Sequence, residues 1–141
     1  HGLAATLERT LAAWQLQHEE IALSHRLALG EVAVSDEVAQ AAVRIVQEGL
    51  TNIVRHARAS QVELLITRSA GELRISLADN GRGCDGQPSP QAGSGLGLAG
   101  MAERVALLGG QLNINNRLGQ GFCLVASLPD QSSIAILEGQ P

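Results

Sequence analysis

The hydrophobic positions of the chain change period along its length, from the spacing of a helix to the alternation of a strand and back. Apolar side chains recur at helical spacing in three segments, which predicts helices at residues 3–14, 35–57 and 97–108. They alternate with polar side chains elsewhere, which predicts strands at 21–27, 61–68, 72–79 and 122–128 and another beginning at 112. Paired strands separated by helices predict an α+β fold. We expect a two-layer sandwich, with a mixed, mostly antiparallel sheet of about five strands and three helices on one face.

Length and composition predict one domain with an aliphatic core. The 141 residues are 45% hydrophobic, yet only Trp14 and Phe122 are aromatic. There is no apolar run near about 18 residues, so we expect a soluble domain. We assign residues 1–129 to this domain and residues 130–141 to a weakly structured C-terminal tail, because the tail carries little pattern.

The net charge and the cysteine content indicate which binding partners and which cellular compartment to expect. The net charge is −4, and the scarcity of aromatic side chains leaves little surface for base stacking, so we expect no nucleic-acid partner. Cys84 and Cys123 have no metal-ligand spacing and form no disulfide framework. A reducing, cytoplasmic setting is the expectation that follows.

The segment 35–57 combines a helix start with a polar sector. Ser35 followed by two acidic residues predicts the N-terminus. A helical projection puts one set of apolar side chains on a common arc: Ala39, Ala42, Val43, Val46, Leu50, Ile53 and Val54. The opposite sector is bordered by Ile45 and Gly49 and holds Glu48, Asn52 and Arg55, with His56 at its edge. A glycine inside a helix costs about 1 kcal/mol relative to alanine, which indicates a packing or ligand-approach reason. We interpret this sector as a site wall; the alternative is an exposed face whose polar groups pair locally.

Asp79 ends the strand 72–79 and continues its inward-facing row of apolar side chains, since side chains two apart share a face. An inward carboxylate needs partners, and a buried acceptor at the end of a strand suits an amino group on a ligand. Turn formation is the alternative role, because D-N-G commonly opens turns. We favour the binding role because Gly81 and Gly83 open space beside the carboxylate.

A second glycine cluster, G-S-G-L-G-L-A-G, follows a polar loop over residues 82–94 and leads into the predicted helix 97–108. Glycine lets backbone N–H groups approach a ligand, and a helix N-terminus adds donors and a positive dipole end. Residues 95–100 formally match G-x-G-x-x-G, but no strand directly precedes them, so the dinucleotide-binding interpretation is rejected. The P-loop motif is also absent from the sequence.

Three motifs together resemble the ATP-binding domain of sensor histidine kinases, whose fold is shared with DNA gyrase and mismatch-repair ATPases. They are E-G-L-T-N-I-V-R-H-A at 48–57, D-N-G-R-G at 79–83 and G-S-G-L-G-L at 93–98. The longer run I-V-Q-E-G-L-T-N-I-V-R-H-A, with G-L-G-L-A-G-M-A-E-R-V-A-L-L-G-G, is similar to the nitrate/hexose-phosphate-sensor class. The resemblance covers roughly residues 2–129.

The resemblance implies roles for the polar sector of the second helix and for Asp79. Asn52 would bind Mg²⁺ that bridges the phosphates of ATP, and Glu48 would hold or polarise water on the metal. Arg55 would face phosphate, and His56 would lie against the nucleotide. Asp79 would accept a hydrogen bond from the adenine amino group.

The resemblance also implies roles for the glycine clusters. Gly81 and Gly83 would flank the adenine. Phosphate-binding N–H groups and lid hinges would come from the second cluster, which comprises Gly93, Ser94, Gly95 and Gly97, with Leu96 and Leu98 packing the lid base. The helix opening near Leu98 would direct its positive end at the phosphates.

Two departures bear on function. The family usually has threonine where this chain has Phe122, which would weaken adenine binding. The helical dimerisation domain with its phosphoacceptor histidine is absent from the sequence, and His18-Glu19-Glu20 is interpreted as surface. The resemblance therefore implies a catalytic domain that acts on a separate dimerisation domain and, in the parent kinase, with a response regulator.

The implied parent is a homodimeric sensor with this domain at its cytoplasmic end, and the fragment itself would be a monomer. Two alternatives stay open. One is a regulatory, anti-sigma-like serine kinase of the same fold. The other is an ATP-binding module with weakened or lost activity.

Overall fold

A computed structural model describes residues 2–30, 33–56, 59–81, 95–117 and 121–130. Its elements follow in chain order: α1 (Gly2–Gln17), β1 (Ala22–Ala28), α2 (Asp36–His56), β2 (Gln61–Ser69), β3 (Glu72–Asp79), α3 (Gly95–Leu107), β4 (Gln111–Arg117) and β5 (Gly121–Pro129). The predicted fold class is confirmed, as is the predicted order of elements. Most boundaries agree with the sequence patterns within a residue or two.

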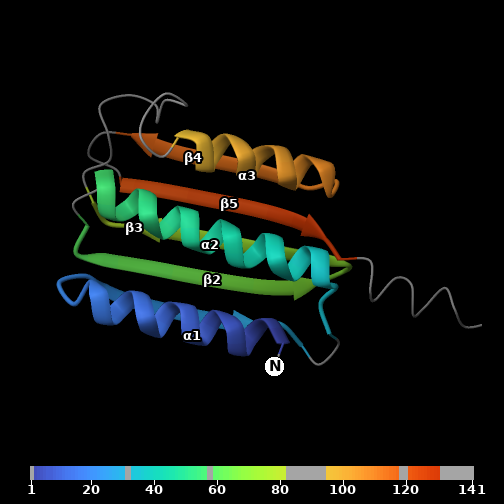
Figure 1. Cartoon of the computed structure of the whole chain (residues 1–141), viewed down its shortest axis with the longest axis horizontal. Coiled ribbons are helices and arrows are strands. Elements are labelled where there is room, and N and C mark those ends of the chain that lie inside the picture. Colours follow the sequence, from blue (N-terminus) through green and yellow to red (C-terminus); the bar gives the residue numbers. More distant parts are fainter. Residues whose placement is uncertain (1, 31–32, 57–58, 82–94, 118–120, 131–141) are drawn as a thin grey trace, which may run out of the picture.

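The strands form one five-stranded sheet in the order β1-β2-β3-β5-β4. β1 pairs with β2 in parallel, and the other neighbours are antiparallel. All three helices lie side by side over one face of this sheet (Figure 1). The core lies between the two layers, where the inward rows of β2, β3 and β5 are almost fully buried.

The hairpin between β2 and β3 is closed by a tight turn. Ala70 and Gly71 both have positive φ, 53° and 74° respectively. Two consecutive positive φ angles are typical of a type I′ turn, whose twist matches that of paired antiparallel strands. The turn thereby fixes the register in which Leu77 faces Leu64 and Asp79 faces Val62.

The buried stripe of α2 is rotated relative to the helical projection. Ile45 and Gly49, expected at the border of a polar sector, are buried, and Asn52 is only 3% exposed. Val54, expected on the apolar arc, is 38% exposed. The stripe differs from the projection because Gly49 lets this side of the helix pack closely against Leu77. Asn52 therefore lies on the core side of the helix.

Gly49 has a packing role. A Cβ at this position would collide with Cδ2 of Leu77, so the glycine lets α2 lie directly against β3. This close approach explains why a residue with poor helix propensity stands in the middle of a helix. Leu77 is two residues before Asp79, so the contact also fixes the distance between α2 and the end of β3.

The end of β5 is anchored at Asp130, one residue beyond the domain boundary expected from the sequence. Asp130 is fully buried, and its N–H donates to the carbonyl oxygen of Gly71 at 2.7 Å. Its carboxylate contacts Arg68 at 2.5 Å and accepts from the N–H of Ser35 at 3.4 Å. The ordered domain therefore includes Asp130, while the remaining tail residues, 131–141, lie outside the described residues.

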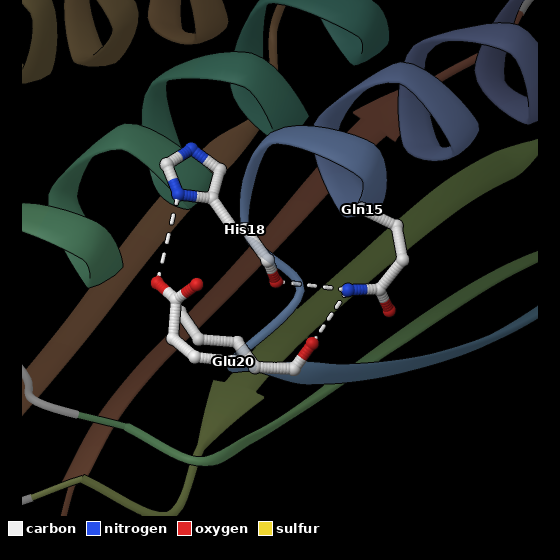
Figure 2. A network of polar contacts seen from close by, with 4 residues as sticks. Gln15, His18 and Glu20 are labelled. Carbon is white, nitrogen blue, oxygen red and sulfur yellow. Dashed lines mark hydrogen bonds and ion pairs between the residues drawn. The ribbon is translucent and has the colours of Figure 1, made fainter.

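A glutamine holds the connection between α1 and β1 (Figure 2). Gln15 Nε2 donates to the carbonyl oxygens of His18 at 3.0 Å and Ile21 at 2.6 Å, and its Oε1 accepts from the N–H of Leu23 at 2.9 Å. His18 is half-buried, and its ring centroid lies 4.9 Å from that of Trp14. Its Nδ1 lies 3.9 Å from an exposed carboxylate oxygen of Glu20. His18 therefore lies in a turn rather than on an extended helix face.

Among the helices of the described residues, none is both long and apolar enough to cross a membrane.

Candidate functional site

The elements that carry the described candidate residues meet at one end of the sandwich. The last turns of α2, the end of β3, the start of β5 and the start of α3 all lie there (Figure 1). Antiparallel pairing of β3 with β5 brings Asp79 beside Gly121 and Phe122. The contact of Gly49 with Leu77 brings α2 over the same end of the sheet.

Asp79 is held by backbone donors from two strand ends. Its Oδ1 accepts from the N–H of Gly81 at 2.5 Å, and its Oδ2 accepts from the N–H of Phe122 at 3.3 Å. The first bond forms an Asx turn, so the turn role and the inward orientation coexist in one residue. Each carboxylate oxygen can accept more than one hydrogen bond, so the group retains capacity for a ligand donor.

Burial raises the pKa of Asp79 above its ordinary value of 3.8, and the bonds from Gly81 and Phe122 oppose that rise. A raised pKa means that the folded protein disfavours the ionised carboxylate relative to the unfolded chain. Asp79 thus combines a cost to the fold with an acceptor at the end of β3. That combination is typical of a residue placed for binding rather than for stability.

We expect Asp79→Asn to make the fold more stable at neutral pH. The advantage of the variant should grow as pH rises from about 3.8 through the folded pKa, because in that range the Asp79 carboxyl ionises in the unfolded wild-type chain before it ionises in the folded one. Above the folded pKa the advantage should stay constant. Urea unfolding of both proteins between pH 3 and pH 8 measures this. A variant that is less stable at every pH would show that the two backbone hydrogen bonds outweigh the burial.

Phe122 is buried at 3% exposure, and its contribution to Asp79 comes from its main chain. The N–H that donates to Oδ2 does not depend on the side chain at this position. The preceding Gly121 has φ of 78°, and a Cβ there would collide with the carbonyl oxygen of Asp79. The contact between β5 and Asp79 therefore requires glycine at 121 and tolerates phenylalanine at 122.

Asn52 and Glu48 are neighbours one turn apart on α2. Asn52 Nδ2 donates to the carbonyl oxygen of Glu48 at 2.8 Å, which fixes the orientation of the side-chain amide. The oxygen of that amide is the end with metal-ligand chemistry. Glu48 is half-buried, while Arg55 is exposed one turn further along the helix.

The start of α3 differs from the prediction. The helix begins at Gly95, two residues before the predicted start at Gly97, so Gly95 and Leu96 belong to its first turn. The first four N–H groups of a helix have no partner within the helix, and the dipole makes that end positive. Anions commonly bind at such a helix end, and the contact of Gly95 to Leu98 with phosphates stays a prediction.

Several predicted site residues cannot be located. Gly83, Gly93 and Ser94 lie outside the described residues, and so does Cys84. The side chains of His56, Leu96 and Leu98 are likewise not described, although their backbone is. Gly81 is described and is half-buried beside Asp79.

Two further residues contact this site and were not predicted from the sequence, Asn80 and Gly121. Asn80 bonds to the start of β2, and Gly121 allows β5 to approach Asp79. A signal for Gly121 exists in the sequence, since a glycine opening a strand often marks a close backbone approach. Asn80 carried no such signal, because its partners are 19 and 20 residues away.

Chemically, this end of the molecule offers an acceptor for an amino group, a fixed side-chain amide and a helix N-terminus for an anion. Within the described ranges, no three His, Cys, Asp or Glu side chains gather as a protein-only metal site requires. A cleft of about 470 Å³ lies elsewhere, between α1 and the first half of α2, and has no contact with Asp79. The acceptor, amide and anion end together suit a ligand with an amino-bearing base and phosphates.

Comparison with known proteins agrees with this geometry. Residues 37–132 match the family described as histidine kinase-, DNA gyrase B- and HSP90-like ATPase. The chain belongs to this family. The match spans α2 through β5 and so includes Asn52, Asp79 and the start of α3.

Individual relatives indicate which kind of ATPase domain this chain is. The chain is 35% identical over 129 residues to the signal transduction histidine-protein kinase/phosphatase DegS of Brevibacillus brevis, covering 91% of this chain and 32% of that protein. It is 28% identical to the histidine kinase domain of the Erythrobacter litoralis EL346 blue-light activated histidine kinase. That comparison has a TM-score of 0.76 and covers 99% of this chain and 66% of the other. Full-length ShkA in complex with AMPPNP is 22% identical with a TM-score of 0.68, covering 91% of this chain and 29% of that one, and shares the fold alone.

The chain is thus an ATPase domain of the histidine-kinase type. It spans about a third of the length of the DegS relative. The similarity to DegS and to the Erythrobacter kinase domain accounts for the predicted resemblance to histidine kinases.

Proposed function

We propose that this domain binds ATP with Mg²⁺ and donates the γ-phosphate to a histidine on a separate dimerisation domain, within a two-component sensor kinase. The observation that carries the proposal is the half-buried Asp79 carboxylate, held by two backbone N–H groups in a chain of the histidine-kinase ATPase type. Bound ATP–Mg²⁺ would supply the transferable phosphoryl group and charge neutralisation. The described residues fit that ligand.

The fit follows from the donor and acceptor chemistry of each element. Asp79 would accept from the base amino group, while Gly81 would line the base. Asn52 would provide an oxygen to Mg²⁺, which usually takes few protein ligands and fills its remaining positions with water and phosphate oxygens. Glu48 would orient metal-bound water. The exposed Arg55 would face the phosphates, and His56 would lie against the nucleotide.

The glycine cluster would complete the phosphate site. The N–H groups of Gly95 and Gly97 in the first turn of α3 would donate to phosphate oxygens. We propose that Gly83, Gly93 and Ser94 contribute to the same site, with Leu96 and Leu98 packing beneath it. Catalysis by such a site is mainly positioning and electrostatic stabilisation, since the nucleophile belongs to the separate domain.

We further propose that the parent belongs to the nitrate/hexose-phosphate-sensor class, acts on a response regulator, and carries this domain in the cytoplasm. The support is the residue run from Ile45 to Ala57 together with the run 95–110. Dimerisation would belong to the rest of the parent. The weakened-module alternative is less favoured, because the N–H of Phe122 bonds to Asp79 regardless of its side chain.

Calorimetric titration of the chain with a non-hydrolysable ATP analogue, with and without Mg²⁺, tests the proposal. Asp79→Asn should weaken binding by about 10-fold or more, because hydrogen bonds to charged groups contribute about 1.5–3 kcal/mol. Asn52→Ala should remove the dependence on Mg²⁺. Asp36→Asn and Asn113→Ala, which alter exposed residues elsewhere, serve as matched controls and should leave binding unchanged. Failure of the wild-type chain to bind the analogue at millimolar concentration would overturn the proposal.

A further inference from the structure

Asn80 is the exposed residue between Asp79 and Gly81, and its side chain bonds to the start of β2. Its Oδ1 accepts from the N–H groups of Ser60 at 3.0 Å and Gln61 at 2.9 Å. Its Nδ2 donates to Ser60 Oγ at 3.0 Å. Its own N–H donates to the carbonyl oxygen of Gln61 at 3.1 Å. Both ends of the amide and the main chain of Asn80 are therefore attached to the same two residues.

These bonds lengthen the ladder between β2 and β3 at its open end. Asp79 is the last strand residue of β3 and lies opposite Val62. Asn80 continues the pairing beyond that point, to Gln61 and Ser60. The carbonyl oxygen of Ser60 also accepts from the N–H of Ala22 at 2.8 Å, so the anchor is itself attached to β1.

The anchored segment includes the turn that orients the Asp79 carboxylate. The bond from the Gly81 N–H to Oδ1 spans Asn80, so it exists only while the peptide units on either side of Asn80 keep their orientation. The side-chain bonds of Asn80 go to Ser60 and Gln61, whereas the bonds to the Asp79 carboxylate come from Gly81 and Phe122. It can thus hold Asp79 in place without touching a ligand.

We infer that Asn80 is a positioning residue for base recognition: it holds the Asp79–Gly81 turn so that Asp79 distinguishes a 6-aminopurine from a 6-oxopurine. This inference rests on the proposed ATP site. An amino group donates to the carboxylate, whereas a 6-oxo group presents a second acceptor and is rejected. Discrimination depends on a fixed carboxylate, because a carboxylate free to rotate turns away from the oxo group.

The test compares ATP with inosine triphosphate, which carries an oxo group in place of the amino group. Dissociation constants of both nucleotides are measured with Mg²⁺ for the wild-type chain and three variants: Asn80→Ala, Asn80→Asp and Gln15→Ala. The wild type should prefer ATP by about tenfold or more. Asn80→Ala should reduce that preference to about twofold, mainly by weakening ATP binding.

The other two variants separate positioning from general stability. Asn80→Asp keeps an acceptor oxygen for the N–H groups of Ser60 and Gln61, so it should retain most of the preference. Gln15→Ala removes a comparable set of side-chain bonds to the backbone, at the α1–β1 connection, and should retain the full preference. An Asn80→Ala variant that is folded and keeps the wild-type preference, or that loses affinity for both nucleotides equally, overturns the inference.

Hydrogen exchange of the unliganded chain gives a readout that needs no nucleotide. Asn80→Ala should speed exchange of the Gly81 amide by about tenfold or more, while the amides of Leu64 and Ile66 in the middle of β2 keep their protection. Unchanged exchange at Gly81 overturns the inference. A wild-type chain that binds neither nucleotide would instead overturn the proposed function, and the exchange result would still decide whether Asn80 orders the turn.

Discussion

Gly121→Ala is expected to lower the free energy of unfolding by about 2–5 kcal/mol and to weaken binding of the ATP analogue, by the fraction that stays folded, about 10-fold. The added methyl group meets the carbonyl oxygen of Asp79, and φ of 78° is unfavourable for alanine. Positive φ costs roughly 1–2 kcal/mol for an L-residue, and overpacking typically adds about 1–3 kcal/mol. The overlap with a backbone oxygen cannot be relieved by a side-chain rotation, so β5 must move.

The movement of β5 should weaken nucleotide binding because β5 contacts Asp79. Phe122, the next residue, donates its N–H to Oδ2 of Asp79 at 3.3 Å, which is already long for such a bond. A displacement of β5 by a few tenths of an ångström breaks it. The carboxylate then loses one of the two donors that orient it.

Gly30→Ala is the matched control for Gly121→Ala. Gly30 also has positive φ, 73°, but a Cβ there meets no atom within 4 Å. This variant should therefore show only the conformational cost of roughly 1–2 kcal/mol and bind normally. Urea unfolding and calorimetric titration of both variants make the comparison. Equal effects of the two substitutions would show that the contact with Asp79 does not matter.

The orientation of Asp79 could be predicted from sequence because it depends on local periodicity. Three apolar residues at alternate positions fix the face on which the next one in the row lies, and no distant part of the chain can change that parity without shifting the register. The same reasoning gave the hairpin and the order of elements. A period of two assigns every strand residue to one face or the other, so alternation in the sequence predicts side-chain orientation well.

The burial of Asn52 could not be predicted in the same way. A helix projection ranks faces by hydrophobicity, yet the buried face of α2 is decided by how closely Gly49 lets it approach Leu77. An asparagine is then buried because its amide bonds to the carbonyl oxygen of Glu48. Such tertiary contacts override the projection, as they override other local preferences.

Asn80 and Asp130 illustrate a further limit. Asn80 is followed by glycine and looked like an ordinary turn residue, but its partners, Ser60 and Gln61, lie on another strand. Asp130 follows the proline that ends β5 and looked like the first residue of a tail. Its partners, Arg68 and Ser35, are far away in sequence. Long-range pairing of polar side chains leaves no periodic signal in a single sequence.

Asp130→Asn is expected to lower the free energy of unfolding by about 3 kcal/mol or more while leaving nucleotide affinity unchanged. Asp130 is fully buried and Arg68 is 6% exposed on its side chain, with 2.5 Å between Oδ2 and Nη2. Removing one partner of a buried ion pair leaves the other charge without its counterion, which typically costs about 3–5 kcal/mol. The N–H of Ser35 at the start of α2 donates to Oδ1, an acceptor that asparagine retains, so the expected loss comes from the ion pair.

Further variants test whether loss of the ion pair between Asp130 and Arg68 causes the loss of stability. Glu72→Gln removes an exposed carboxylate near the same hairpin turn and should change stability by less than about 0.5 kcal/mol. Adding Arg68→Met to Asp130→Asn removes the charge left behind, so the double variant should be more stable than the sum of the two single losses predicts.

Asp130 lies at the opposite end of β5 from Phe122 and Asp79, so the folded fraction of Asp130→Asn should bind the ATP analogue like the wild type. Weaker binding by that fraction would mean that the two ends of the sandwich are coupled through β5, and strict additivity of the double variant would mean that the ion pair does not act as a unit.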